Sequence, residues 1–190
     1  MLTLHSILEP KSDAIDNIGM DEGMKVVMRF NEAWWESATG GPVSCMITEG
    51  PAAWCWPLTY KKYYDSSGEQ DHILVCFSMG QNAIDLKSNA KNDKNIIEAV
   101  LDDLDAMFPN TPATDSYSGD GYVQDWGAHE YTRGVYSFPT VDTIDDDGNA
   151  FKGNARKTLQ QPVGRILFAG EATHLTASAS VPGAGESKTE

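Results

Sequence analysis

The chain has 190 residues, of which 41% are hydrophobic and 22% are charged, a balance typical of one folded domain or slightly more and not of a disordered chain. Acidic residues outnumber basic residues 28 to 14, and the net charge of −14 argues against a nucleic-acid partner, which needs a basic face. No apolar run approaches the roughly 20 residues that a membrane-spanning helix requires, so no membrane partner is expected.

The N-terminal part of the chain predicts a helix followed by a strand. Residues 11–18 should form a short helix, because Pro10 stands just before them and Gly19 just after. Residues 25–30 have the sequence Lys-Val-Val-Met-Arg-Phe, which is mostly apolar and favours a strand.

The middle of the chain predicts a hairpin-like pair of strands and an amphipathic helix. The strands are expected at residues 52–60 and 72–79, with the turn-forming residues Asp-Ser-Ser-Gly between them. Residues 93–108 place apolar side chains at intervals of three and four, as one face of a helix does. Another extended segment is expected over residues 117–126.

An acidic stretch at residues 141–149 predicts a surface loop. Within it Asp145, Asp147 and Gly148 resemble part of a calcium-binding loop, but Lys152 stands in the neighbourhood where such a loop needs a bidentate acid. Calcium is therefore the weaker of two interpretations. No other metal site is expected, because the four histidines share no ligand spacing with the cysteines.

The three cysteines predict free thiols. Cys45, Cys55 and Cys76 form no Cys-x-x-Cys pair and have apolar neighbours in the sequence. An odd number without the spacing of a disulfide framework favours buried thiols in a reducing compartment, such as the cytoplasm or the peroxisome.

The most informative segment lies near the C-terminus, where a short apolar run over residues 166–169 stops at Gly170 and Glu171 follows at once. A buried strand that ends in glycine and then an acid is how α/β folds bring the backbone close to a bound nucleotide. The Gly-x-Gly-x-x-Gly turn that opens such a site is absent from the 190 residues. The segment therefore predicts the closing half of a cofactor site.

Four segments, in this order, resemble the flavin-containing amine oxidase family, in the branch of the polyamine oxidases and lysine-specific histone demethylases. They are the helical segment 11–20, the strand Met24-Lys-Val-Val-Met-Arg-Phe30, the segment Trp126-Gly-Ala-His-Glu-Tyr-Thr-Arg-Gly-Val-Tyr-Ser137, and Ile166-Leu-Phe-Ala-Gly-Glu-Ala-Thr173 followed by Val181-Pro-Gly-Ala184. The resemblance covers nearly the whole chain but only the last part of a family member, so the chain looks like a C-terminal fragment.

This resemblance implies an α/β (α+β) fold in two parts. Residues 1–136 would form part of a substrate-binding domain, a mixed sheet flanked by helices. Residues 137–190 would form the closing segment of an incomplete FAD-binding, Rossmann-like domain.

The resemblance also implies the site residues. Lys25 would be catalytic, its ammonium holding a water near the reactive edge of the flavin. Tyr136 and Ser137 would bind the amine. The residues expected to bind FAD are Trp126, Tyr131, Gly170, Glu171, Val181, Gly183 and Ala184.

Each of these residues has a physical reason and a plainer alternative. Gly170 lets the backbone approach a pyrophosphate, and the acid after it can accept from a ribityl hydroxyl. Backbone N–H groups of the 181–184 turn can stabilise charge on the flavin. Alternatively, Lys25 is a solvated surface lysine, the aromatics belong to a core, and the glycine and the serine serve turns.

The implied activity is FAD-dependent oxidation of an amine of the polyamine type by hydride transfer to the flavin, with O2 reduced to H2O2. The implied partners are a small amine and the FAD-binding portion that this sequence lacks. Two alternatives stay open: a catalytically inactive, truncated module that binds no FAD, and a chain that pairs with a separate FAD-binding partner. Ala177 favours the first alternative, because relatives usually carry an aromatic at that place.

Overall fold

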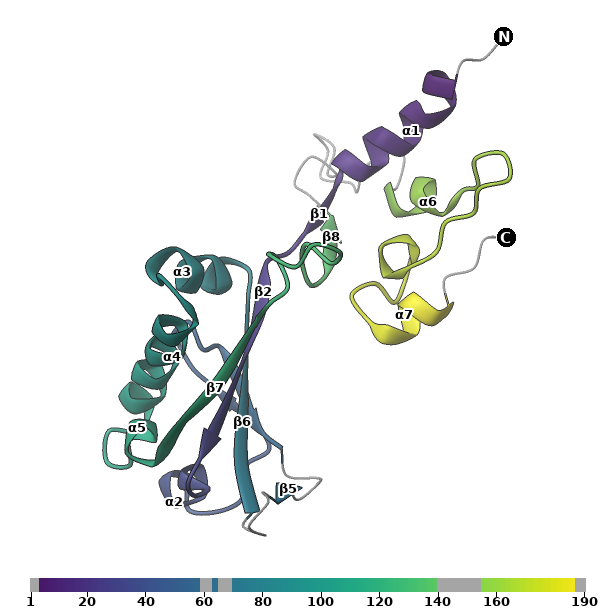
Figure 1. Ribbon diagram of the computed structural model, residues 1–190. Coiled ribbons are helices and arrows are strands. Elements are labelled where there is room, and N and C mark those ends of the chain that lie inside the picture. Colours follow the sequence, from purple (N-terminus) through teal and green to yellow (C-terminus); the bar gives the residue numbers. More distant parts are fainter. Residues whose placement is uncertain (1–3, 59–62, 65–69, 140–154, 187–190) are drawn as a thin grey trace. The chain divides into compact units, whose positions relative to one another are not determined.

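The computed structural model describes residues 4–58, 63–64, 70–139 and 155–186, which belong to two compact units (Figure 1). The first unit comprises Met1–Asp21 and Tyr136–Glu190, and the second comprises Glu22–Val135. The predicted acidic loop at 141–149, with its calcium alternative, lies outside the described residues. Among the described helices, none has both the length and the apolar character needed to cross a bilayer.

The second unit is built on an antiparallel sheet. Its strand order is β3 (Met46–Ile47), β4 (Trp54–Pro57), β6 (Gln70–Met79), β2 (Gly23–Phe30) and β7 (Tyr117–Asp125), and β5 (Tyr63–Tyr64) pairs with β6. The combination of helices and sheet confirms the predicted α+β class. Every pairing between the described strands is antiparallel, whereas the resemblance implies a mixed sheet.

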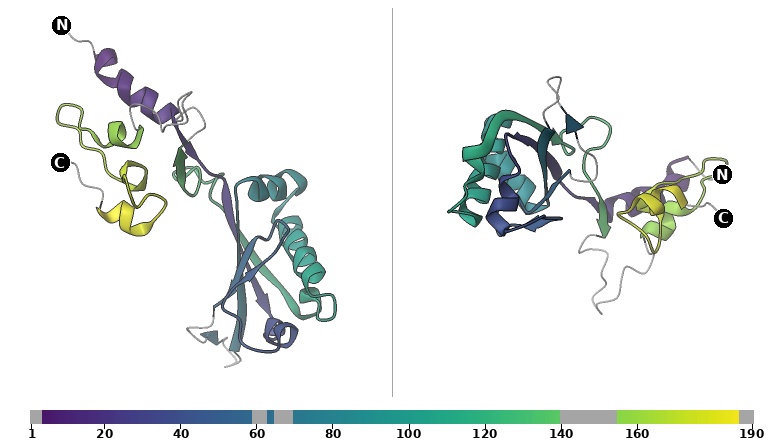
Figure 2. Two further views of the ribbon diagram at one scale, coloured as in Figure 1. Left: turned by 180° about the vertical axis from the view of Figure 1, so that it is seen from behind. Right: turned by 90° about the horizontal axis from the view of Figure 1, so that it is seen from below.

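Helices cover one face of this sheet, as both side views show (Figures 1 and 2). They are α3 (Gln81–Asn89), α4 (Asp93–Met107) and α5 (Ala113–Ser116), while α2 (Trp34–Thr39) follows the end of β2. Asn92 starts α4, because its side chain accepts a hydrogen bond from the N–H of Asn95. The predicted strands at 25–30 and 72–79 and the predicted helix at 93–108 are confirmed as β2, β6 and α4.

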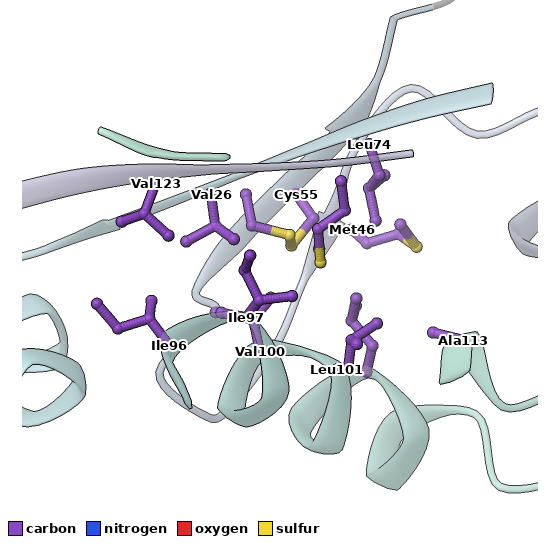
Figure 3. Packing of buried hydrophobic residues seen from close by; sticks show 14 of the residues in the cluster. Val26, Met46, Cys55, Leu74, Ile96, Ile97, Val100, Leu101, Ala113 and Val123 are labelled. Carbon is purple, nitrogen blue, oxygen red and sulfur yellow. A yellow bond between two sulfur atoms is a disulfide. The ribbon is translucent and has the colours of Figure 1, made fainter. Parts of the chain in front are cut away.

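The core lies between the helices and the sheet (Figure 3). Alternate residues of β2 are buried toward the helices, and one stripe of α4 packs against them. Complete burial of an apolar side chain contributes roughly 1.5–3 kcal/mol, so this layer dominates the stability of the unit. The buried residues of these two elements are Met24, Val26, Met28, Phe30, Ile96, Ile97, Val100, Leu101 and Leu104.

The cysteine prediction is wrong. Cys55 and Cys76 form a disulfide inside the core, and the third cysteine, Cys45, is exposed. The reason is the register of β4 and β6, which places Cys55 directly opposite Cys76 with their Cα atoms 4.0 Å apart. Twenty-one positions separate them in the sequence, and nothing in that spacing indicates the pairing.

The first unit contains small elements. These are α1 (Leu4–Asp16), the paired strands β1 (Ile18–Met20) and β8 (Ser137–Pro139), α6 (Ala155–Gln160), the 3-10 turn η2 (Glu171–Thr173) and α7 (Val181–Glu186). Helix α1 is longer than predicted and contains Pro10. The helix continues through Pro10, although proline removes one backbone hydrogen bond, and it packs against α6. The buried Lys11 fastens the two helices by donating to the carbonyl of Thr158 at 2.6 Å.

Candidate functional site

The site residues predicted from the sequence fall on both units, and each group is described by itself. In the second unit, Lys25 belongs to β2 and lies on the sheet face opposite the helices, because its neighbours Met24 and Val26 point into the core. The strand pairs at this position with β6 on one side and β7 on the other, so Lys25 is held in the centre of the sheet.

Aromatic side chains lie on one side of Lys25, on β6 and β4. Phe77 on β6 stands directly opposite it, and Trp54 on β4 stands directly opposite Phe77. The Lys25 ammonium lies 5.8 Å from the ring centroid of Trp56 and 6.0 Å from that of Phe77, the outer limit of a cation–π attraction. On the other side of Lys25, Gln124 of β7 stands directly opposite it.

Trp126 lies at the same end of β2, immediately after β7. Its N–H donates to the carbonyl of Gly23 at 3.0 Å, and its carbonyl accepts from the N–H of Gly134 at 3.0 Å. These bonds fix the backbone of Trp126 two residues after Gln124, the cross-strand partner of Lys25. Tyr131, by contrast, is 84% exposed and contacts the ring of His129 at 6.0 Å.

An ion pair fastens the end of β7. Asp125 lies 2.9 Å from Lys87 on α3 and also accepts from the N–H of Ala128 at 3.0 Å. Burial alone would raise the pKa of Asp125, but the hydrogen bonds from Lys87 and Ala128 and the charge of Lys87 lower it overall. The same hydrogen bond raises the pKa of Lys87 against the opposite effect of burial.

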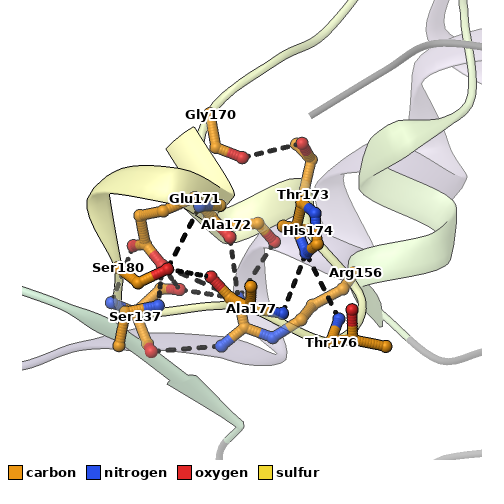
Figure 4. A network of polar contacts seen from close by, with 12 residues as sticks. Ser137, Arg156, Gly170, Glu171, Ala172, Thr173, His174, Thr176, Ala177 and Ser180 are labelled. Carbon is orange, nitrogen blue, oxygen red and sulfur yellow. Dashed lines mark hydrogen bonds and ion pairs between the residues drawn. The ribbon is translucent and has the colours of Figure 1, made fainter. Parts of the chain in front are cut away.

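In the first unit, the structure brings Ser137 and Glu171 together (Figure 4). The N–H of Ser137 donates to Oε1 of Glu171 at 2.9 Å, and the Ser137 hydroxyl donates to Oε2 at 2.9 Å. Oε2 also accepts from the N–H of Ala179 at 2.8 Å. Donors from Ser137, which precedes Glu171 in the sequence, and from Ala179, which follows it, therefore fix the carboxylate.

Arg156 is the residue that the sequence analysis missed. It is buried on α6, and its guanidinium donates to the hydroxyl of Ser137 at 2.7 Å and to the carbonyl of Ala172 at 3.1 Å. A second nitrogen donates to the carbonyl of Ser137 at 3.1 Å. No motif indicates this role, because an arginine in a short helix ordinarily lies at the surface.

The remaining predicted residues of this unit lie in turns. Gly170 has a φ of 131° with open space where a Cβ would stand, so this conformation itself favours glycine. Gly183 is required for another reason, because a Cβ there would lie 1.9 Å from the carbonyl oxygen of Ala177. Val181 is 86% exposed, and Tyr136 is also exposed.

Two of the N–H groups expected to face the flavin are bonded within their own turn. The N–H of Gly183 donates to the hydroxyl of Ser180 at 3.1 Å, and the N–H of Ala184 donates to the carbonyl of Ser180 at 3.1 Å. These two N–H groups already have acceptors, so a cofactor-binding role for Gly183 and Ala184 would depend on the shape of their backbone. That role stays a prediction.

The residues present fit part of an FAD site. Among the described residues, Oε1 of Glu171 accepts one hydrogen bond, which leaves capacity for a hydroxyl donor such as those of the ribityl chain. The open space beside Gly170 would allow a ligand to approach the backbone. Both features belong to the segment that the sequence analysis assigned to the cofactor.

The apolar run before Gly170, however, is not the buried strand that the sequence predicted. Ile166 and Leu167 are 59% and 65% exposed, and Ile166 forms only an isolated bridge with Val163. The reason is that the described part of this unit holds only the two-stranded pair of β1 and β8, and no larger sheet against which the run could pack.

Comparison with known proteins gives a consistent result. The sequence model of the family described as flavin containing amine oxidoreductase matches residues 3–187. Polyamine oxidase 4 of Oryza sativa subsp. japonica is 28% identical over 174 residues, which are 92% of this chain and 31% of the relative. Lysine-specific histone demethylase 1 homolog 1 of the same plant is 24% identical over 92% of this chain and 19% of its own length.

Solved structures agree on the fold. Cyclohexylamine oxidase from Brevibacterium oxydans superimposes with a TM-score of 0.66 at 19% identity, over 94% of this chain and 35% of that enzyme. A variant of putrescine oxidase gives a TM-score of 0.68 at 18% identity, over 92% and 35% of the two chains. The chain thus spans about a third of the length of the polyamine oxidases and of the solved structures that it matches.

Proposed function

Because this chain belongs to the family of flavin-containing amine oxidoreductases, we propose that it supplies the substrate-binding part and the closing flavin segment of an FAD-dependent amine oxidase. The observation that carries the proposal is the family match over residues 3–187. The polyamine oxidases among the relatives support a polyamine-type substrate.

The chemistry that FAD supplies when bound is acceptance of a hydride from the carbon next to the amine nitrogen, after which the imine hydrolyses and O2 takes up the two electrons as H2O2. Protein groups position the amine and tune the cofactor. Lys25 would orient water or O2 through its ammonium. The aromatic row of Trp54, Trp56 and Phe77 would exclude water and attract the cationic or apolar parts of a polyamine.

In the first unit, Glu171 would hold FAD by accepting from a ribityl hydroxyl. Gly170 would allow the cofactor to lie against the backbone, since no side chain stands there. Val181 would pack against it from the start of α7.

Titration of the purified chain with FAD tests the proposal. We expect a shift of the flavin absorbance bands and a change of tryptophan fluorescence, followed by H2O2 production when spermine and O2 are added. A colourless chain whose fluorescence does not respond to FAD would contradict the proposal for this chain. Apo protein without FAD serves as the control for peroxide formed by other routes.

A second candidate is a catalytically inactive module of the same family that does not bind FAD. It is favoured by one observation, the absence of a Gly-x-Gly-x-x-Gly turn from the 190 residues, since that turn carries the pyrophosphate in this kind of site. The same titration decides between the two, because such a module would leave free FAD unchanged.

A further inference from the structure

Arg156 is a buried cation in the first unit, and the proposed chemistry has no use for its charge. One of its terminal nitrogens bonds the hydroxyl of Ser137 and the carbonyl of Ala172, and the other bonds the carbonyl of Ser137 (Figure 4). The guanidinium also lies 4.0 Å from Oε2 of Glu171. It therefore ties β8 to the turn that carries Glu171.

The chemistry of these groups fixes the direction of every bond. A guanidinium only donates hydrogen bonds, and an ionised carboxylate only accepts them. The Ser137 hydroxyl must therefore accept from Arg156 and give its single proton to Oε2 of Glu171. Its proton is committed, and with Ser137 only 3% exposed the hydroxyl presents almost no surface to a ligand.

We propose that Ser137 and Arg156 are positioning residues for the Glu171 carboxylate, and that Ser137 does not bind the amine. The relay from Arg156 through Ser137 holds Oε2, while Oε1 keeps capacity for a hydroxyl of FAD. This assignment rests on the proposed function, and it replaces the substrate role that the sequence resemblance gives Ser137.

Three donors on two oxygens remove the rotational freedom of the carboxylate before the cofactor arrives. A group held in its bound geometry loses less entropy on binding than a free one, so the relay favours FAD affinity. The effect needs no contact between FAD and Arg156. If Arg156 were merely structural, it would stabilise the whole unit. Its replacement would then weaken the hydrogen bonds of Glu171 no more than the other hydrogen bonds of the unit.

Amide hydrogen exchange, measured by NMR on the chain without FAD, separates these roles. The amides of Ser137 and Ala179 both donate to Glu171, whereas the amide of Asn17 donates to the carbonyl of Asp13 in the same unit and serves as the internal reference. In Arg156→Gln we expect exchange at Ser137 and Ala179 to accelerate about tenfold relative to Asn17, the cost of weakening a hydrogen bond to a charged group.

The matched control is Arg165→Gln, which changes an exposed arginine of the same unit and should leave all three amides unchanged. Ser137→Ala should accelerate Ala179 in the same way, although the two residues are far apart in the sequence. Unchanged exchange at Ala179, or equal acceleration of all three amides in Arg156→Gln, would overturn the relay.

FAD titration gives the second readout. Ser137→Ala and Glu171→Gln should each weaken FAD binding about tenfold, and the double variant should bind no more weakly than Glu171→Gln alone, because both changes remove one unit. A hundredfold loss in the double variant would show independent contacts and overturn the proposal. So would Ser137→Ala with normal FAD affinity and an increased KM for spermine.

The two proposals fail in different ways. A wild-type chain that binds no FAD contradicts the proposed function and, with it, the role of the relay toward FAD. A wild-type chain that binds FAD, but whose Ala179 amide does not respond to Arg156→Gln, overturns the relay alone.

Discussion

The ammonium of Lys25 lies near the rings of Trp56 and Phe77, and among the described residues it forms no ion pair with a carboxylate. A cation attracted only by the faces of Trp56 and Phe77 keeps its charge available for a third group, whereas a salt bridge would neutralise it. At the residue scale this is the property that suits a lysine to orient water or O2. Lys87, on α3 of the same unit, has the carboxylate of Asp125 beside it instead.

Replacing Lys25 with methionine tests that property, because the side chain keeps its length and loses its charge. In the FAD-bound protein we expect Lys25→Met to slow flavin reduction by spermine or reoxidation by O2 by 10–100-fold, roughly 1.4–2.7 kcal/mol, while FAD stays bound. Stopped-flow absorbance measures both steps. Lys91→Met, on the exposed connection between α3 and α4, is the control, and wild-type kinetics in Lys25→Met would remove Lys25 from the site.

At the scale of elements, the disulfide between β4 and β6 lies directly behind the aromatic row. Cys55 stands between Trp54 and Trp56, and Cys76 precedes Phe77, so the covalent bond fixes the register that sets these rings beside Lys25. The loop that it closes is comparable to those for which cross-linking contributes about 3 kcal/mol.

The paired substitution Cys55→Ala with Cys76→Ala should therefore lower the free energy of unfolding by about 3 kcal/mol in urea titrations. Cys45→Ala should change it little, because that cysteine is exposed. Alkylation in urea without reductant should label Cys45 alone, and mass spectrometry that finds all three cysteines labelled would show that the bond is absent.

The ion pair between Lys87 of α3 and Asp125 of β7 should make the free energy of unfolding depend on pH. The pKa of Asp125 is lowered from 3.8, so its stabilisation is present above that value and is lost as pH falls through the folded value. The pKa of Lys87 is raised from 10.5, so its part is present below that value and is lost as pH rises through the folded value. Between pH 3.8 and pH 10.5 the contribution of this ion pair to the free energy of unfolding should not depend on pH.

Asp125→Asn should lower the free energy of unfolding by about 1 kcal/mol at pH 7, a value discounted because Lys87 is 44% exposed. The difference from wild type should narrow at pH 3, because below pH 3.8 the unfolded chain takes up a proton at Asp125 that the folded state resists. Glu98→Gln removes the exposed pair with Lys94 and leaves an oxygen to accept from the side chain of Asn95, so it is the control and should have a smaller effect. An equal difference at both pH values would contradict the assignment.

How far the sequence predicts these elements depends on the range of the interactions. The alternation in β2 and the helical period of α4 are local, and both elements were predicted to within a few residues. Helix α1 packs against α6, and the disulfide depends on strand register, so both involve contacts between residues far apart in the sequence that local patterns do not predict. Lys25 and Glu171 came from a family resemblance, whereas Arg156 becomes visible only through its burial and its partners.

At the scale of the whole chain, the two units differ in what holds them together. The hydrophobic cluster belongs entirely to the second unit, whereas the buried apolar side chains described in the first unit are Ala14 and Ala155. In the described part of the first unit the buried contacts are instead mostly polar, such as those of Arg156 and Lys11, whose net contribution is smaller than that of a large apolar core. Burial also lowers the pKa of Lys11, which weakens its charged form.

This difference predicts two unfolding transitions. All five tryptophans belong to the second unit, so their fluorescence reports on that unit, whereas far-UV circular dichroism also detects α1, α6 and α7. In urea we expect circular dichroism to begin changing at a lower concentration than fluorescence, because the first unit opens first. Since FAD would bind only the folded first unit, it should shift the earlier transition to a higher urea concentration. At a hundredfold excess of FAD over its Kd, the free energy of unfolding of that unit should rise by about 2.7 kcal/mol. Coincident transitions for both probes would show instead that the units unfold as one, and that the polar contacts of Glu171 and Arg156 are as strong a support as the core.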